Sequence, residues 1–320
     1  MSSVIYLGPS NALGAAQAVL EPRWPVLAPE PTPESVGALL GEAVAVLDAS
    51  MLVRFDRTTL DRAPALRVFS TATTGADHID AQVLADRSIP LLTLAGERDL
   101  LHNLTPAAEH AWLLLMACAR RIRGAIQHVL EGKWRREEFP GVMLKGKTLG
   151  LIGCGRIGSW MARYADAFQM DVVGYDPFVG AWPEPIKRSD LDSLLGTADF
   201  VSIHVPLNEQ TRGMIAEREF GLLKPGAVFI NSSRGGVTDE QALLKALREG
   251  QLGAVGLDVL DGEPAIDGHP LVEYARTHEN LIITPHIGGF CPDAVSVVVA
   301  HAARRIARVL SGDQNSPDGE

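Results

Sequence analysis

Short apolar runs alternate with longer amphipathic segments in the first part of the chain. Runs bounded by turn residues predict buried strands at Val4–Leu7, Val44–Leu47, Leu66–Ser70 and Leu91–Leu94. Helical composition between these runs predicts helices at Ala12–Leu20, Pro33–Gly41 and Ile79–Asp86. Because strands and helices take turns along the chain, we expect a small α/β unit here.

A long helix is predicted to begin near Thr105. Thr105 can serve as N-cap, and Pro106 suits the first helical position, where its missing N–H has no partner to lose. The pattern continues through Gly132 and is apolar around most of the helix surface. Such a helix must be buried, so we expect it to pack between domains or between subunits.

From Thr148 onward the alternation becomes stricter. Strand-like runs are TLGLIG, DVVGYD, ADFVSIHVP, AVFINSSR, GAVGLDV and LIITPH, and helical segments lie at Ser159–Phe168, Leu191–Leu195 and Asp239–Glu249. This spacing predicts a parallel, doubly wound sheet. A last helix at Pro292–Leu310 is expected to return to the first unit. We therefore expect a domain of residues 105–290 inserted into one made of residues 1–104 and 291–320.

Composition narrows the function classes. The chain has 320 residues and a net charge of −10, with no run of Lys or Arg that would indicate nucleic-acid binding. Its three cysteines are too few and too scattered for a disulfide framework or a zinc site, which fits a reducing compartment and predicts no metal. The chain starts without a signal-peptide pattern, and its most apolar segment, Ala111–Ala119, is too short to span a membrane. We expect a cytoplasmic protein.

The first candidate site is a glycine-rich turn, Gly153–Gly158, with the pattern GxGxxG. A predicted strand precedes it, a helix follows, and the next strand ends in Asp176, 18 residues past the last glycine. That context is typical of dinucleotide binding. Gly153 allows the tight turn, Gly155 lets the backbone approach a pyrophosphate, and Gly158 lets helix and strand pack closely. The N–H groups that face the phosphates are those of Arg156 and Ile157.

Asp176 indicates which dinucleotide binds. Its carboxylate can accept hydrogen bonds from both ribose hydroxyls and would repel a 2′-phosphate. The residues after it, Pro177, Phe178 and Val179, provide no compensating Arg. We therefore expect NAD rather than NADP. The alternative is an acid that only closes a turn before proline. Cys154 is interpreted as a small space-filling residue rather than a reactive thiol.

Further motifs follow in a fixed order: His204-Val205-Pro206-Leu207, Asn231–Gly236, Gly256–Val259 leading to Glu263-Pro264, and Thr284–Gly289. With the glycine-rich turn, they make the sequence resemble the D-isomer-specific 2-hydroxyacid dehydrogenase family, most closely its phosphoglycerate dehydrogenase branch, over roughly residues 45–305. The resemblance implies a Rossmann NAD-binding domain inserted into a smaller flavodoxin-like substrate domain. It also implies hydride transfer between NAD and a small 2-hydroxy or 2-keto acid, and a homodimer.

The resemblance implies that Arg234, Glu263 and His286 are the catalytic residues, and the chemistry of these side chains supports each role. Reduction of a keto acid needs a proton donor, and histidine titrates near working pH. A carboxylate such as Glu263 favours the imidazolium and orients the ring. Arginine binds a carboxylate with two N–H groups and polarises the keto oxygen. Without the accompanying motifs, each of these three residues would more often be a turn or surface residue than a catalytic one.

By resemblance, further residues line the coenzyme. Asp258 is expected to contact the nicotinamide carboxamide, and Gly288 and Gly289 to let the backbone approach the same ring. The wall along the coenzyme is expected to consist of His204, Val205, Pro206, Ser232 and Ser233. His204 is interpreted as part of this wall rather than as an acid or base.

Substrate recognition is predicted from the first domain. By resemblance, Arg54 reaches the distal end of the substrate; the alternative is a solvated arginine after a strand. The segment TATTGADHID resembles the family's carboxylate loop, which would direct the N–H groups of Thr74 and Gly75 at the substrate. Thr73 replaces a usual glycine there and His78 replaces an asparagine, so the shape of the loop stays open.

The segment Ala95–Asn103 is longer than the corresponding loop of the family. Its residues Arg98, His102 and Asn103 could face the pocket, since loops often set specificity. We expect Arg98 to bind substrate and the substrate to differ from plain 3-phosphoglycerate. Trp134–Arg136 also resembles the family, and we expect it either to pack against a partner subunit or to be a simple surface anchor. We expect no appended regulatory domain.

Two alternatives remain open. One is a dinucleotide-sensing binding or regulatory protein of the same fold, like the C-terminal-binding corepressors, which keep catalytic-like residues. The other keeps an enzyme but replaces the substrate by formate, phosphite or glyoxylate. Turnover of NADH with a panel of 2-keto acids distinguishes these hypotheses.

Overall fold

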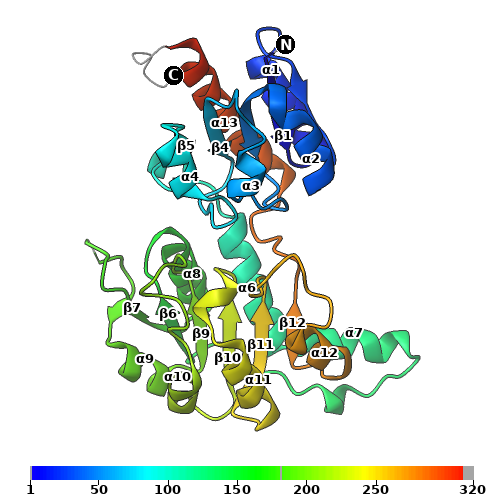
Figure 1. Ribbon diagram of the computed structural model, residues 1–320. Coiled ribbons are helices and arrows are strands. Elements are labelled where there is room, and N and C mark those ends of the chain that lie inside the picture. Colours follow the sequence, from blue (N-terminus) through cyan, green and yellow to red (C-terminus); the bar gives the residue numbers. More distant parts are fainter. Residues whose placement is uncertain (1, 181, 313–320) are drawn as a thin grey trace. The chain divides into compact units, whose positions relative to one another are not determined.

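The computed structural model describes residues 2–180 and 182–312. The chain divides into two compact units, each described here by itself (Figure 1). The first unit extends to Leu104 and resumes at Phe290, and the second is Thr105–Gly289.

The first unit is built on a five-stranded parallel sheet in the flavodoxin-like order β2-β1-β3-β4-β5. The strands are β1 (Ser3–Leu7), β2 (Val26–Leu27), β3 (Ala43–Asp48), β4 (Val68–Thr71) and β5 (Leu91–Leu92). The helices are α1 (Ser10–Leu20), α2 (Pro33–Leu39), η1 (Leu40–Glu42), α3 (Arg57–Leu60), α4 (Ala81–Asp86), α5 (Arg98–His102) and α13 (Pro292–Ser311).

Helices cover both faces of this sheet. Side chains of β1 alternate between two cores: Val4 and Tyr6 pack with α1 and α13, whereas Ile5 and Leu7 pack with α2, α3 and α4. Because every residue of β1 and β3 is buried, these strands are apolar without alternation, except at Ser3, which begins β1, and Asp48, which ends β3. The elements that the pattern missed, β2, α3 and α5, are too short to show a period.

The second unit has a seven-stranded parallel sheet in the order β12-β11-β10-β9-β6-β7-β8, the Rossmann order extended by one strand. The strands are β6 (Thr148–Ile152), β7 (Asp171–Tyr175), β8 (Lys187–Arg188), β9 (Phe200–Ile203), β10 (Ala227–Asn231), β11 (Leu252–Leu257) and β12 (Leu281–Ile283). The helices are α6 (Pro106–Ala119), α7 (Ile122–Leu130), η2 (Arg136–Glu138), α8 (Arg156–Ala167), α9 (Leu191–Thr197), α10 (Glu217–Leu222), η3 (Gly235–Val237), α11 (Glu240–Arg248) and α12 (Pro270–Thr277).

In the second unit, α6 and α8 cover one face of the sheet, and α9 to α12 cover the other. The predicted pair of doubly wound parallel sheets is therefore confirmed. Helices α10 and α12 and the two-residue strand β8 were not predicted. Strand β8 lies at the edge of the sheet beside β7, where the end of the dinucleotide-binding motif is found.

The prediction of one long helix after Thr105 is wrong. The helix ends at Ala119, and Arg121 takes a left-handed conformation with φ of 51° before α7 begins. The guanidinium of Arg121 hydrogen-bonds the Glu138 carbonyl and pairs with Glu279, contacts that the sequence pattern cannot show. Only α6 is largely buried, against α8, β10 and β11. The hydroxyl of Thr105 does not cap the backbone but donates to Glu109.

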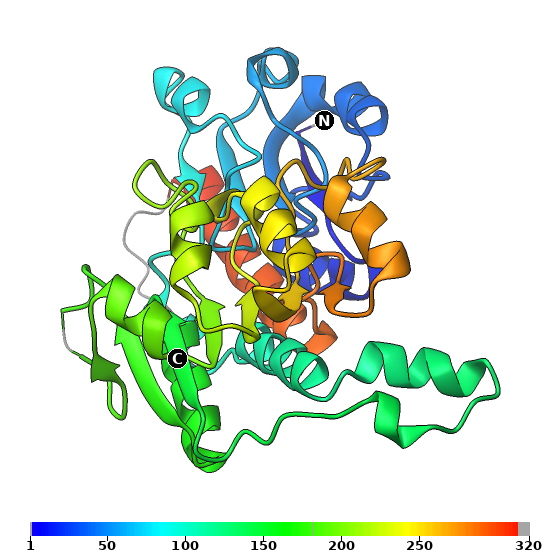
Figure 2. The same cartoon turned by 90° about the horizontal axis from the view of Figure 1, so that it is seen from below.

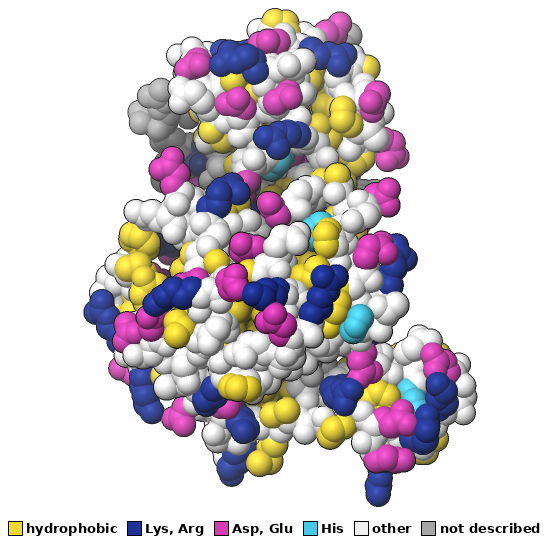
Figure 3. Space-filling model, turned by 60° about the horizontal axis from the view of Figure 1, so that its bottom comes forward, with side chains coloured by type: hydrophobic (Ala, Val, Ile, Leu, Met, Phe, Trp, Pro, Cys, Tyr) yellow, Lys and Arg dark blue, Asp and Glu magenta, His cyan; other side chains and the backbone are white. Residues whose placement is uncertain are grey.

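Helix α7 and the segment after it form an arm that extends away from the sheet of the second unit (Figures 1 and 2). Its large apolar side chains are exposed: Ile122, Ile126, Val129, Leu130, Trp134, Val142 and Met143. On the face drawn in Figure 3, acidic and basic side chains are intermixed. No helix among the described residues is long and apolar enough to cross a membrane. Within the same part of the chain, no group of His, Cys, Asp and Glu could hold a metal ion.

Candidate active site

The glycine-rich turn joins β6 to the first turn of α8, where Arg156 and Ile157 lie. Gly153 has φ of 94°, and a Cβ at this position would lie 2.4 Å from the carbonyl oxygen of His204. A Cβ at Gly158 would lie 2.2 Å from the carbonyl oxygen of Gly153. The helix can therefore pack this closely on the turn only if residue 158 has no side chain. By contrast, a Cβ at Gly155 would meet nothing within 4 Å. The turn is therefore open at a helix N-terminus, a geometry that fits a dinucleotide pyrophosphate.

Asp176 follows β7 and is held by three backbone N–H groups. Its Oδ2 accepts from Cys154 N at 2.9 Å, and its Oδ1 accepts from Phe178 N at 2.9 Å and Val179 N at 3.1 Å. The carboxylate thus closes a turn, as one interpretation of the sequence had it, and also connects the end of β7 to the glycine-rich turn.

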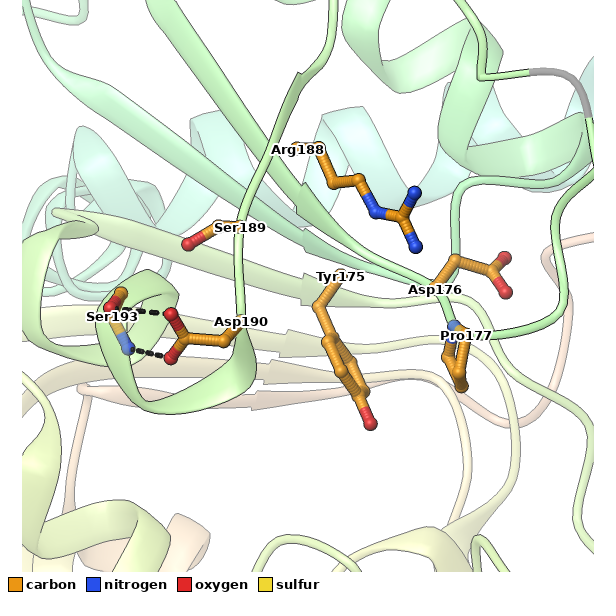
Figure 4. Close-up of a pocket in the computed structure, with 7 residues that line it drawn as sticks. All are labelled: Tyr175, Asp176, Pro177, Arg188, Ser189, Asp190 and Ser193. Carbon is orange, nitrogen blue, oxygen red and sulfur yellow. Dashed lines mark hydrogen bonds between the residues drawn. The ribbon is translucent and has the colours of Figure 1, made fainter.

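Asp176 also lines an open cavity of about 600 Å³ (Figure 4). The cavity is lined by Tyr175, Asp176, Pro177, Arg188, Ser189, Asp190 and Ser193. No pattern in the sequence predicts an arginine in the same cavity as Asp176, because Arg188 belongs to the unpredicted strand β8. The residues directly after Asp176 contain no arginine, but folding brings one to the same cavity.

His204 follows β9 beside the glycine-rich turn. Burial lowers the pKa of its ring to about 3, and the Ser202 hydroxyl lies 2.9 Å from its Nε2. A ring that stays neutral at working pH suits a coenzyme wall better than acid–base chemistry. Burial and the nearby Asp176 carboxylate raise the pKa of the Cys154 thiol to about 12, so this thiol is not a reactive nucleophile.

His286 and Glu263 form a histidine–carboxylate pair in the second unit. His286 Nδ1 lies 2.5 Å from Glu263 Oε1, and both side chains keep about 30% exposure (30% and 29%). Glu263 Oε2 accepts a hydrogen bond from Leu260 N at 3.1 Å, which fixes the carboxylate. His286 has φ of 53°, a conformation that a non-glycine residue adopts only where its surroundings enforce it.

Asp258 enforces the conformation of the loop that carries His286. Its Oδ1 accepts from Thr284 Oγ1 at 2.5 Å and Ile287 N at 2.9 Å, and its Oδ2 accepts from Gly288 N at 2.7 Å. His110 Nε2 on α6 lies 3.2 Å from Asp258 Oδ1. Both carboxylate oxygens are therefore engaged within the protein.

Burial alone would raise the pKa of Asp258, but the hydrogen bonds from His110, Thr284, Ile287 and Gly288 outweigh it and hold this pKa below its usual value. A Cβ at Gly288 would lie 2.9 Å from Asp258 Oδ2, whereas Gly289 is open. The sequence showed His110 only as an interruption of an apolar helix, so its contact with Asp258 was missed.

Arg234 lies in the loop after β10, which Asn231 holds in place. The Asn231 amide donates to the Arg234 carbonyl at 2.9 Å and accepts from the Ser233 hydroxyl at 2.8 Å. Ser232 Oγ is a buried hydroxyl that has no hydrogen-bond partner among the described residues. A Cβ at Gly235 would lie 2.1 Å from Asp261 N, so the Arg234 loop packs directly on the loop that leads to Glu263.

In the first unit, an isolated bridge between Phe55 and Ile79 brings the predicted substrate segments together. It places the exposed Arg54 beside the TATTGADHID loop. The Thr73 hydroxyl donates to the Gly75 carbonyl at 2.7 Å. The N–H groups of Thr74 and Gly75 make no hydrogen bond to the described part of the chain. They are therefore available to an anion.

His78, which departs from the family pattern, fixes the same loop to the sheet. Its Nε2 lies 2.7 Å from Oδ2 of Asp48, a fully buried residue at the end of β3. Asp48 Oδ1 also accepts from Ser50 N at 2.7 Å and Met51 N at 3.2 Å. The histidine therefore keeps the loop ordered through a contact of its own.

The long segment before α6 contains the short helix α5, which begins at the exposed Arg98. Glu97 fixes the start of α5 to α13: its Oε2 lies 3.0 Å from His301 Nε2, and its Oε1 lies 3.1 Å from Arg305 Nη1. Arg305 also donates to the Thr93 carbonyl at 2.6 Å. The extra length is therefore ordered structure.

Comparison with known proteins identifies the class. Residues 112–288 match the family model described as "D-isomer specific 2-hydroxyacid dehydrogenase, NAD binding domain". The chain belongs to this family, as the resemblance predicted, and its coenzyme is NAD.

Among curated relatives, D-3-phosphoglycerate dehydrogenase of Archaeoglobus fulgidus is 35% identical over 80% of this chain and 48% of its own length. The chain thus spans about half the length of that relative and of similar ones. Hydroxypyruvate reductase of Thermotoga maritima is 37% identical over 77% of this chain and 78% of its own.

Among solved structures, the TT0316 protein of Thermus thermophilus has a TM-score of 0.84 at 33% identity, covering 98% of this chain and 97% of its own. D-lactate dehydrogenase of Aquifex aeolicus, complexed with NAD and lactic acid, has a TM-score of 0.83 at 25% identity, covering 97% and 96%.

Proposed function

We propose that this chain catalyses reversible hydride transfer between NAD and a small 2-hydroxy or 2-keto acid of the D series. The observation that carries the proposal is the pairing of His286 Nδ1 with Glu263 Oε1 at 2.5 Å, on a loop that Asp258 holds in a strained conformation. Bound NAD supplies the hydride chemistry at its nicotinamide ring.

The protein residues supply the proton and the binding of substrate. Because Nδ1 of His286 is engaged by Glu263, its Nε2 is the atom that exchanges a proton with the substrate oxygen. In reduction, Nε2 would give its proton to the oxygen of the keto group; in oxidation, it would accept the proton from the hydroxyl group. Arg234 binds the carboxylate and the keto oxygen, where negative charge develops.

Residues of the first unit are proposed to bind the substrate. The N–H groups of Thr74 and Gly75 are available to its carboxylate, and Arg54 and Arg98 are exposed cations that suit a polar distal group. The ordered segment around α5 supports a substrate other than plain 3-phosphoglycerate. Initial rates with NADH and pyruvate, glyoxylate, hydroxypyruvate and phosphohydroxypyruvate would identify the preferred acid.

The direct test is His286→Ala. Loss of general acid catalysis is expected to lower kcat by about 10²–10⁴-fold while the Kd for NADH, from fluorescence titration, changes little. His278→Ala, which removes a histidine at the end of α12, is the matched control and should keep full turnover. Full kcat in His286→Ala would overturn the acid–base role. Tight NADH binding without turnover of any acid by the unmodified chain would favour the sensing protein instead.

We further propose a homodimer located in the cytoplasm. The arm around α7 supports the dimer, because several large apolar side chains are exposed on one segment and such a group usually marks a contact with another chain. The free cysteines Cys118, Cys154 and Cys291 support a reducing compartment.

A further inference from the structure

We propose that Arg188 is a second determinant of coenzyme selection. In this proposal, Asp176 disfavours a 2′-phosphate, while Arg188 supplies the cation that would bind such a phosphate once the carboxylate is removed. The inference rests on dinucleotide binding at the Gly153–Gly158 turn and goes beyond the preference for NAD that Asp176 alone predicts.

The sheet register places Arg188 next to the end of β7. Arg188 pairs with Gly174, and Asp176 lies two residues beyond Gly174. Figure 4 shows the guanidinium extending from β8 towards the Asp176 side of the cavity. The guanidinium lies 5.3 Å from the centroid of the Trp182 ring, and that indole donates to the Ile186 carbonyl at 2.6 Å. Stacking on a fixed ring limits the positions that the arginine can take.

The other charged groups nearby are already engaged. Asp190 directs both carboxylate oxygens at Ser193, with contacts of 2.8 Å to its N and 2.8 Å to its Oγ. Lys187, the neighbour of Arg188 on β8, pairs with Asp171 at 3.1 Å and does not line the cavity. Among the described residues that line the cavity, Arg188 is the cation.

The chemistry of the two coenzymes follows from this arrangement. A ribose 2′-hydroxyl beside Asp176 can donate to the carboxylate, whereas a 2′-phosphate there meets a negative charge fixed by three backbone N–H groups. A guanidinium matches phosphate oxygens with two parallel N–H groups, and such charge-assisted hydrogen bonds are stronger than those between neutral groups. Arg188 is therefore expected to offset part of the repulsion between Asp176 and a 2′-phosphate. When Asp176 is replaced, the attraction of Arg188 for the phosphate is expected to be the larger effect.

Binding of adenosine 2′,5′-bisphosphate, compared with ADP, tests the proposal without any turnover. The variants are Asp176→Ser, Arg188→Met, the double variant, and Lys187→Met as the matched control on the same strand. Isothermal titration should show that Asp176→Ser raises affinity for the bisphosphate about tenfold or more. Adding Arg188→Met should remove most of that gain, whereas adding Lys187→Met should preserve it.

Two results would overturn the proposal: no gain for the bisphosphate in Asp176→Ser, or an equal gain with and without Arg188. Because Asp176 also fixes a turn, Asp176→Asn is the second variant, since its amide oxygen can still accept from that turn; thermal melting verifies that both fold. The expected binding pattern does not require turnover, so a chain that binds NAD but turns over no acid would also show it. Failure of this binding test and failure of the proposed reaction can therefore be told apart.

Discussion

Asp258 organises the candidate active site at the scale of one residue. The family resemblance implies that it contacts the coenzyme, and the structure shows in addition that both its carboxylate oxygens are engaged by the loop that carries His286. Because His286 is held at a positive φ, the loop needs contacts that offset its strain. Asp258 provides these contacts, and His110 adds one from α6.

We expect Asp258→Asn to destabilise the protein by about 1–3 kcal/mol at neutral pH, because hydrogen bonds to a buried carboxylate are lost. The folded-state pKa of Asp258 is lowered, so its contribution is present above the unfolded-state pKa of about 3.9 and disappears as pH falls through the lower folded-state pKa. The difference in Tm between wild type and variant should therefore narrow below about pH 4.

Thermal melts of both proteins from neutral to acid pH measure this difference. Asp166→Asn, which changes an exposed carboxylate on α8, is the control and should alter Tm little. A Tm difference for Asp258→Asn that stays constant as the pH falls would contradict the assignment.

At the scale of elements, the segment from Ala95 to Asn103 shows what a sequence pattern leaves undecided. Its length was visible, but its order comes from Glu97, which contacts His301 and Arg305 on α13. Glu97 is thus a positioning residue for Arg98 and α5.

If Arg98 binds the acid, Glu97→Ala should raise KM for the keto acid several-fold and leave kcat and the KM for NADH nearly unchanged, because only the placement of Arg98 is relaxed. Arg98→Ala should raise the same KM at least as much. Steady-state kinetics measure the split, Glu97→Gln should restore part of the effect, and Glu34→Ala on α2 is the surface control. An equal loss in kcat and in both KM values would indicate general damage instead.

The prediction of helices and strands succeeded where an apolar repeat extends over several residues. It failed where a single long-range contact determines where an element ends. The buried strands of both sheets and helices α1, α8, α11 and α13 follow from apolar patterning. The break between α6 and α7 depends on Arg121 and its contacts with Glu138 and Glu279, which are distant in sequence. Strand β8 is two residues long and polar, so no periodic signal exists.

At the scale of the whole molecule, the arm of α7 predicts assembly. Ile126 and Leu130 are 56% and 76% exposed on this arm, an unfavourable state for large apolar side chains in water. We expect sedimentation velocity to show a dimer for the wild type, and the double variant Ile126→Asp with Leu130→Asp to shift it to monomer.

Val297→Asp, a change at an exposed apolar residue of α13, is the control and should remain dimeric. A monomeric wild type, or a double variant that stays dimeric, would contradict the role of the arm.

The sequence by itself determined the fold class and the glycine-rich turn, and its motifs carry the family resemblance that implies the candidate catalytic residues. It could do so because periodic burial and short motifs are properties of neighbouring residues. Only the tertiary structure decided which side chains meet: Arg188 with the Asp176 cavity, His110 with Asp258, and Glu97 with α13. These contacts join residues on different elements, and their existence depends on the packing of the chain rather than on any local pattern.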